Sequence, residues 1–329
     1  MSTLHITNGD SAADTLRTFL ADPVIITADP LFEGPAPDVE DDRWYPLRGR
    51  KLAGQDGGER DIAAELAASD RRVAEAVRCG SDIVLWFEHD LFDQLLLIRT
   101  LDRIRTDADR SLNATGGTSL ICIDRFPGVE RFIGLGQLTA EQLATLVEHK
   151  RPVTGQQFDH AARAWTAFRA DHPAALASLI GPGPLPFLGA ALRRLLEEYP
   201  STFNGLSRSA MQALQVLDEG PLDAGTLFVA SQRLEEHPFI GDWSLFNVLR
   251  LLASAPVPLV TIRPDPTPVD LRGHIVEATE AGERVRAGRQ DAIALNGIDE
   301  WRGGVHLTGE RWSPWRWDAA RGTLISLEA

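Results

Sequence analysis

Two patterns of hydrophobic residues, one typical of strands and one typical of helices, alternate along the first 150 residues. Short runs rich in β-branched and aromatic residues, which favour strands, occur at residues 4–7, 24–27, 83–87 and 119–123. Stretches with apolar side chains at three- and four-residue spacing, typical of amphipathic helices, occur at residues 12–20, 61–78 and 91–105. Such alternation indicates an α/β fold with a mainly parallel sheet and flanking helices. We therefore predict an α/β domain over residues 1–150.

Helical periodicity continues alone after this region. Thr139 and Gln142 have the spacing of a capping box at a helix start, and residues 158–168 place apolar side chains on one helical face. The sequence GPGPLP at residues 181–186 separates two further helices, because Gly and Pro interrupt helical hydrogen bonding. These features predict a helical middle part, with a connector over residues 151–203.

The last part of the chain combines helices with short strands. Helices are expected from Ser207, up to about Leu234 and over residues 242–252, and strands follow from residue 259. Three helices followed by a hairpin-like β section are typical of a winged helix-turn-helix. We predict a winged-helix-like domain with an aromatic β tail over residues 204–329. The tail's four tryptophans can stack on a sugar or base, although alternating aromatics more often fill a small sheet core.

One stretch of the α/β region has no sustained period. Residues 35–60 are rich in Pro, Gly and acidic side chains, which indicates a long surface loop or flap. Such a loop could cover a site.

The composition excludes several classes of protein. The 329 residues include 33 basic and 47 acidic side chains, a net charge of −14, which opposes binding to nucleic acid or anionic lipid. With only Cys79 and Cys122, neither a disulfide framework nor a cysteine-based metal site is expected. Apolar runs such as residues 83–87 are too short to span a bilayer, and the N-terminus lacks the pattern of a secretory signal. We expect a cytoplasmic protein.

Polar residues follow each of the four predicted strands. They are Asn8, Gly9, Asp10 and Ser11; Asp29 and Glu33; Glu88, His89 and Asp90; and Asp124 and Arg125. The carboxyl ends of parallel strands meet at one edge of a sheet, where ligands of open α/β folds bind. This arrangement predicts a ligand cleft at that edge. The alternative is that loops are polar and helices need N-caps in any α/β protein.

The densest constellation is LWFEHDLFDQL, in which Glu88, His89 and Asp90 follow the third strand. A carboxylate beside an imidazole suits general acid/base catalysis, so these three residues are the predicted catalytic group. The same side chains, with Asp93 one helical turn later, could hold a divalent metal ion through oxygen and nitrogen ligands. The alternative for Asp90 and Asp93 is stabilisation of a helix N-terminus.

Two loops are predicted to bind an anionic group of a substrate. Residues 8–11 join a strand to a helix, whose first backbone N–H groups and dipole favour phosphate or carboxylate. Arg125 could clamp such an anion bidentately, and Asp29 is assigned to the same substrate-binding edge. The alternatives are helix capping by Asp10 or Ser11 and an ion pair between Arg125 and Asp124.

Several motifs carry a resemblance to a known family. They are HITNGDSAADTL, DPLFEGPAP, LWFEHDLFDQL, RFPGVERFIGLGQL, LPFL, EYPSTFNGLSRS, HPFIGDWSLF and GGVHLTG, in this order. Together they resemble the bacterial family named domain of unknown function 1835, over nearly the whole chain. That family implies no activity or catalytic residue. The resemblance implies DPLHEGP where this chain has DPLFEGP, so Phe32 replaces a histidine and argues against a histidine role there.

Two functional hypotheses follow. The first is an enzyme that acts on an anionic small molecule or nucleotide by hydrolysis or group transfer. Redox chemistry is disfavoured because the chain has no dinucleotide-binding fingerprint. The second is a ligand-sensing regulatory or adaptor protein whose winged-helix-like part binds a protein partner. DNA is the less favoured target because residues 237–250 carry few basic groups.

Overall fold

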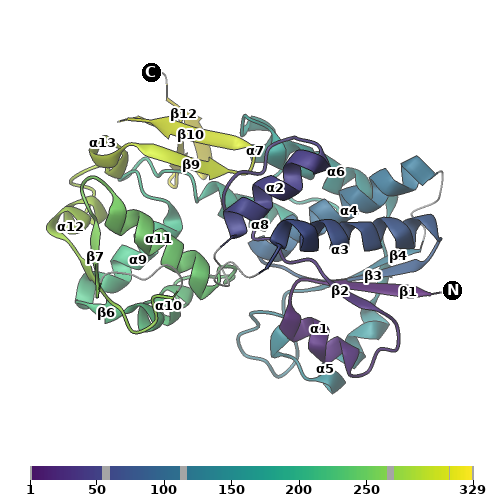
Figure 1. Ribbon diagram of the computed structural model, residues 1–329. Coiled ribbons are helices and arrows are strands. Elements are labelled where there is room, and N and C mark those ends of the chain that lie inside the picture. Colours follow the sequence, from purple (N-terminus) through teal and green to yellow (C-terminus); the bar gives the residue numbers. More distant parts are fainter. Residues whose placement is uncertain (1, 54–59, 112–116, 265–269, 311, 328–329) are drawn as a thin grey trace. The chain divides into compact units, whose positions relative to one another are not determined.

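The computed structural model describes residues 2–53, 60–111, 117–264, 270–310 and 312–327 (Figure 1). The chain divides into two compact units. The first comprises Met1–Phe32, Asp38–Arg50 and Asp61–Leu192, and the second comprises Glu33–Pro37, Lys51–Arg60 and Arg193–Ala329. The segment 151–203, treated above as a connector, is therefore divided between the two units after Leu192.

The first unit is built on a five-stranded sheet. Its strands are β1 (Thr3–Thr7), β2 (Val24–Ile26), β3 (Asp82–Glu88), β4 (Thr118–Ile123) and β5 (Arg151–Pro152). The order is β2-β1-β3-β4-β5, with the first four strands parallel and β5 antiparallel to β4. The predicted parallel sheet is confirmed. Because the chain passes from β1 outward to β2 and then returns to β3, the strand order reverses between β1 and β3. This reversal makes a topological switch point.

Helices cover both faces of this sheet (Figure 1). One face carries α1 (Asp10–Arg17) and α5 (Ala140–Leu146), and the other carries α3 (Ile62–Arg78), α4 (Leu91–Ser111) and α6 (Gly155–Arg169). Leu16, Leu143 and Leu146 of the first face share a core cluster with Trp86 of β3. Capping fixes where helices start: Gln142 N–H donates to Thr139 Oγ1 and Thr139 N–H donates to Gln142 Oε1, which confirms the predicted capping box.

The prediction of a surface loop over residues 35–60 is wrong for α2 (Asp41–Leu52); residues 54–59 lie outside the described residues. Trp44, Arg48 and Leu52 recur every four residues and are all buried, so α2 has an inward face. One of these three buried positions is a charged Arg, which hides the helical period in the sequence. Pro46 within the helix also argued against it.

The longest segment of the second unit begins within α8 (Leu188–Leu196) and combines helices with small antiparallel sheets. Its elements are α9 (Arg208–Val216), β6 (Leu222–Asp223), α10 (Ala224–Gln232), α11 (Asp242–Ser254), β7 (Val260–Arg263), β8 (Ile275–Ala278), α12 (Glu280–Arg286) and α13 (Ala292–Asn296). The first three strands form an antiparallel sheet in the order β6-β8-β7. Leu214, Leu249 and Val276 belong to the core that these helices and strands share.

Two hairpins end the second unit. They are β9 (Ile298–Arg302) with β10 (Val305–Gly309), and β11 (Trp315–Asp318) with β12 (Thr323–Ser326). Trp317 is buried, whereas Trp301 stacks on His306 across the hairpin with ring centroids 4.2 Å apart. These two tryptophans pack within the small sheets. In the part of the chain that the structure describes, every helix is too short or too polar to cross a membrane.

Candidate functional site

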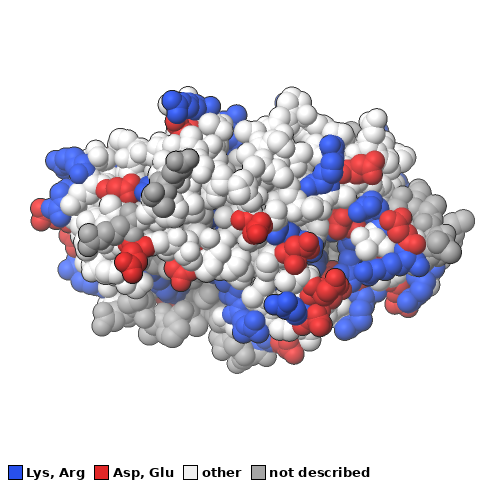
Figure 2. Space-filling model, turned by 90° about the horizontal axis from the view of Figure 1, so that it is seen from above, with Lys and Arg blue, Asp and Glu red and all other residues white. Residues whose placement is uncertain are grey.

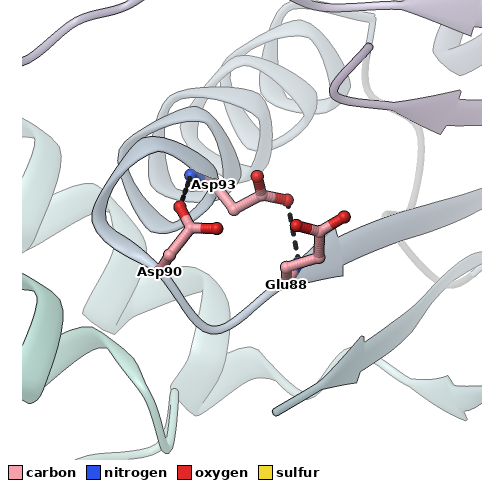
Figure 3. A group of neighbouring side chains, drawn as sticks. All are labelled: Glu88, Asp90 and Asp93. Carbon is pink, nitrogen blue, oxygen red and sulfur yellow. Dashed lines mark hydrogen bonds between the residues drawn. The ribbon is translucent and has the colours of Figure 1, made fainter. Parts of the chain in front are cut away.

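Three carboxyl groups converge at the carboxyl end of β3. Glu88 is the last residue of β3, Asp90 lies in the turn that follows, and Asp93 lies in the first turn of α4 (Figure 3). One carboxylate oxygen of each lies within 4.8 Å of the others. Their exposed fractions are 4 %, 5 % and 0 %, so this carboxylate cluster lies below the surface.

The turn between β3 and α4 is held by the cluster's own residues. The Asp93 N–H donates to Asp90 Oδ1 at 3.0 Å, so Asp90 caps α4, as its position after a strand predicts. The Glu88 N–H donates to Asp93 Oδ1 at 2.8 Å, and Gln94 Nε2 donates to the Glu88 carbonyl oxygen at 2.6 Å. Capping therefore fixes the geometry of the cluster and leaves carboxylate oxygens directed toward one another (Figure 3).

Asn8 joins the neighbouring strand to the cluster. It follows β1, which pairs with β3 in parallel, and its Nδ2 donates to Asp93 Oδ2 at 2.5 Å. The cluster and Asn8 therefore occupy the switch point between β1 and β3. In open α/β sheets, this is the place where ligands bind.

Burial dominates the electrostatics of the cluster. It raises the pKa of Glu88 to about 8 and that of Asp90 to about 7, and the negative charge of Asp90 adds to the effect on Glu88. Burial, with the charges of Glu88 and Asp90, also raises the pKa of Asp93 well above its ordinary value. The Asn8 amide and backbone N–H groups, which are neutral, donate hydrogen bonds to these carboxylates, and the Glu88 and Asp90 carboxyls also hydrogen-bond to each other. Near neutral pH, the cluster therefore either retains protons or favours a positively charged ligand.

The donor set suits a hard divalent cation. Carboxylate and amide oxygens are the ligands that Mg²⁺, Mn²⁺ and Ca²⁺ prefer. Cys122 lies beside the cluster with its Sγ donating to the Glu88 carbonyl oxygen at 3.4 Å. Burial, followed by the charge of Asp93, raises the pKa of this thiol, so it stays protonated and is a poor metal ligand. Among the described residues, the group that could hold a metal consists of Glu88, Asp90 and Asp93.

His89 has a different environment from its two neighbours. Its buried ring lies against Phe132 and Phe187, with centroids 6.0 and 6.2 Å from theirs. The metal-competent group does not include it. The predicted acid/base role of His89 therefore stays a prediction, and Asp93 joins the predicted residues Glu88 and Asp90.

The predicted anion-binding turn lies at the start of α1. Gly9 is the N-cap residue and makes no side-chain cap, while Asp10 and Ser11 are exposed in the first turn. The Ser11 hydroxyl donates to the Gly136 carbonyl oxygen at 3.1 Å. Neither side chain caps α1 in the way that the alternative interpretation required. Because these residues follow Asn8 directly, they lie at the end of the strand that borders the cluster.

Asp29 and Arg125 are both engaged in ion pairs. The Asp29 carboxylate accepts two hydrogen bonds from Arg48 Nε, at 3.0 and 3.1 Å, and both side chains are buried. Arg125 is exposed and pairs with Asp124 at 2.8 Å, which is the alternative contact that the sequence allowed. In this structure, the Asp29 and Arg125 side chains bond to other protein groups, and their predicted binding of substrate stays a prediction.

The loop that follows β4 contacts the cluster, and the sequence did not predict this contact. The Leu135 N–H donates to Glu88 Oε1 at 2.5 Å, and a Cβ atom on Gly134 would lie 2.6 Å from Glu88 Oε2. The glycine spacing in FIGLGQL was the available signal, because glycines permit a backbone to approach another group closely.

No protein-family model matches the chain, and no curated protein matches it. The resemblance to domain of unknown function 1835 stays a prediction. The features of the chain that bear on its function are therefore the chemistry of the carboxylate cluster and its place at the switch point.

Proposed function

We propose that the protein is an enzyme that hydrolyses, or transfers a group from, an anionic small molecule or nucleotide. The observation that carries this proposal is the convergence of the Glu88, Asp90 and Asp93 carboxylates within 4.8 Å, at the switch point of a parallel sheet. Buried ionisable groups with strongly raised pKa values are enriched at functional sites. Asp70, a buried carboxylate outside the cluster, is paired with Arg99 instead.

An anionic substrate could bind beside the carboxylate cluster only if a cation were bound there as well. A phosphate or carboxylate beside three carboxylates would be repelled, whereas a divalent ion bound by them would reverse the local charge. When bound, such an ion would polarise a phosphoryl or carbonyl oxygen and orient the group under attack. Glu88, Asp90 and Asp93 would hold it, with Asn8 fixing the orientation of Asp93 through its hydrogen bond.

The remaining roles fall to residues around the cluster. The backbone N–H groups of the first turn of α1, from Asp10 onward, would bind a distal anionic group of the substrate. His89, adjacent in sequence to both Glu88 and Asp90, is the proposed proton carrier.

Direct metal binding tests the first step of this proposal. We expect Mn²⁺, followed by electron paramagnetic resonance on the whole chain, to bind one site. Replacing a ligand, as in Asp93→Asn, should weaken that binding at least ~10-fold, the lower end of the effect seen for supporting residues of metal sites. Asp102→Asn is the matched control, because Asp102 lies further along the same helix as Asp93 but pairs with Arg105 outside the cluster. Equal Mn²⁺ affinity in wild type and Asp93→Asn would overturn the metal assignment.

Turnover tests the second step. A panel of nucleoside phosphates and phosphate esters, assayed with Mg²⁺ or Mn²⁺, should contain a substrate whose conversion is lost in Glu88→Gln and His89→Ala. Circular dichroism should show that both variants remain folded. Conversion per folded molecule that is unchanged in both variants would show that the chemistry lies elsewhere.

A second candidate function rests on the second unit. Its helix and strand order, α9-β6-α10-α11-β7-β8 with the sheet β6-β8-β7, is the order of a winged helix-turn-helix. In that assignment, α11 takes the place of the recognition helix. It carries one basic residue, Arg250, whose guanidinium lies over Trp243, and an exposed apolar side chain, Leu251. This surface favours a protein partner over DNA, and ligand binding without turnover in the panel would favour a ligand-sensing adaptor.

A further inference from the structure

We infer that residues 132–138 form a positioning loop for Glu88, in which Gln137 is the positioning residue. The contacts that carry this inference are independent of any ligand. Its consequence for metal affinity rests on the proposed function. The loop belongs to the motif RFPGVERFIGLGQL, in the first unit.

The loop backbone donates a hydrogen bond to one carboxylate oxygen of Glu88 and packs closely against the other oxygen. The Leu135 N–H donates to Oε1 at 2.5 Å. A Cβ atom on Gly134 would lie 2.6 Å from Oε2, 3.0 Å from Oε1 and 3.1 Å from the carboxyl carbon. Real Cβ atoms essentially never lie within 3.0 Å of another heavy atom, so a side chain at position 134 would displace the Glu88 carboxylate from this orientation.

Gln137 holds the backbone of the loop in this conformation. Its Oε1 accepts the N–H groups of Ile133 at 2.6 Å and of Gly134 at 3.2 Å, and its Nε2 donates to the Arg131 carbonyl oxygen at 3.3 Å. Through these three hydrogen bonds, one side-chain amide holds the backbone from Arg131 to Gly134 in a curved conformation around itself. Gln137 does not touch Glu88 in any described contact, so its influence passes through Gly134 and Leu135.

Both ends of the loop are anchored. Phe132, Leu135 and Leu138 are buried in the same core cluster as Leu16 of α1, whereas Ile133 remains 47 % exposed. Gly136 accepts the Ser11 hydroxyl at 3.1 Å, which joins the loop to the first turn of α1. Apolar anchoring fixes where the loop lies, but polar contacts from Gln137 orient its N–H groups. The loop therefore links the proposed anion-binding turn to the proposed metal ligand.

A matched set of glutamine variants tests the inference. Gln137→Ala removes the three contacts, whereas Gln137→Glu keeps the acceptor for both N–H groups. Gln142→Ala is the control, because Gln142 makes the same kind of cap with Thr139 at the start of α5, five residues later. We expect Gln137→Ala to lose hydrogen-exchange protection at the Leu135 amide, and both Gln137→Glu and Gln142→Ala to keep it.

Mn²⁺ affinity of the same full-length variants gives the functional readout. We expect a loss of ~10-fold or more in Gln137→Ala, recovery in Gln137→Glu and no change in Gln142→Ala. If Gln137→Ala and Gln142→Ala keep equal protection at Leu135 and equal Mn²⁺ affinity, the positioning role is refuted. If wild type binds no Mn²⁺ but Gln137→Ala still loses protection at Leu135, the positioning role stands and the proposed metal site fails.

A glycine pair provides an independent variant in case Gln137→Ala unfolds. Gly134→Ala places a methyl group against the Glu88 carboxylate, whereas Gly155→Ala, at the first residue of α6, meets nothing within 4 Å. We expect only Gly134→Ala to weaken Mn²⁺ binding. Equal affinity in the two variants would contradict the claim that Glu88 is positioned by close backbone contact.

Discussion

Glu88, Asp90 and Asp93 differ from other buried acidic residues of the chain in what surrounds them. Asp70 is also buried, and burial alone would raise its pKa, but the charge and hydrogen bonds of Arg99 lower the pKa overall. The carboxylate cluster has neutral donors in place of an arginine. A protein stores free energy in such an arrangement, because one unit of pKa shift corresponds to about 1.4 kcal/mol.

This stored energy predicts a pH dependence of stability. In the unfolded chain these carboxyls titrate near pH 4 (a general value), whereas in the folded protein the pKa values of Asp90 and Glu88 rise to about 7 and 8. The folded state therefore binds more protons between these limits. The contribution of the cluster to stability is complete below about pH 4 and is lost as the pH rises through 7 and 8.

Urea unfolding at pH 5, 7 and 9 without divalent ions measures this effect. The free energy of unfolding should fall with pH in wild type and fall less in Asp93→Asn, because the variant removes one member of the cluster. Adding Mn²⁺ should restore stability at pH 9. Asp124→Asn should keep the wild-type slope. A slope that is identical in wild type and Asp93→Asn would contradict the raised pKa values.

At the scale of elements, a buried ion pair holds α2 in place, together with the contacts of Tyr45 with Asp70 and of Asp41 with Arg103. Arg48 on its inward face pairs with Asp29, which follows β2, and both side chains are almost fully buried. Burying one charge without its partner is far more costly than burying the pair. The pair therefore fixes how α2 lies against the end of β2.

Replacing one residue of the Arg48–Asp29 pair should lower the free energy of unfolding. We expect Arg48→Met to lower the free energy of unfolding by about 3–5 kcal/mol, and the double variant Arg48→Met/Asp29→Asn to recover part of it, since no buried charge then remains alone. Arg125→Met, in the exposed pair with Asp124, should leave the free energy of unfolding unchanged. Urea denaturation of the three variants measures this. Equal stability of Arg48→Met and Arg125→Met would exclude a structural role for the buried pair.

Elements were predictable from sequence where one face of each was uniformly apolar. The strands β1 to β4 and the helices α1, α3 and α4 have apolar spacings that burial explains. Their ends lie within three residues of the prediction, except that α4 continues six residues beyond the predicted end at residue 105. α2 was missed because Arg48 becomes compatible with burial only through Asp29, 19 residues earlier in the chain. Such a partner cannot be inferred from local periodicity.

The candidate site also has a part that the sequence predicts and a part that it does not. Glu88 and Asp90 were predictable because the residues after parallel strands share one sheet edge. The contact of Leu135 with Glu88 joins residues 47 positions apart and depends on how residues 132–138 fold back over the sheet. Periodicity carries no information on such an approach.

At the scale of the whole molecule, charge limits the partners of the chain. The net charge is −14, and Figure 2 shows Lys and Arg side chains interspersed with Asp and Glu on one face. Two acidic residues that precede α11 are paired with arginines. Glu235 is buried and pairs with Arg194 at 2.7 Å, and Glu236 pairs with Arg208. Repulsion of phosphates therefore depends mainly on the net charge.

We expect no salt-dependent binding to random duplex DNA. A protein that neutralises several phosphates loses affinity steeply between ~50 and ~200 mM salt, because counterions are released on binding. Fluorescence anisotropy of a labelled duplex at these two salt concentrations measures the effect. Tight binding at low salt that disappears at high salt would show that a local basic surface outweighs the net charge.

The reactivity of the two cysteines can be used to measure local opening of the first unit. Cys79 is exposed after α3, whereas the Cys122 thiol is bonded to the Glu88 carbonyl oxygen and approached by Gln94. Burial raises the pKa of the partly exposed Cys122 thiol, and the thiolate is the form that attacks thiol reagents, so Cys122 should react slowly until β4 and the start of α4 separate. In a Cys79→Ser variant, the rate of thiol modification would report how often the end of β3 opens to water. A ligand that binds there should slow that rate in proportion to its occupancy.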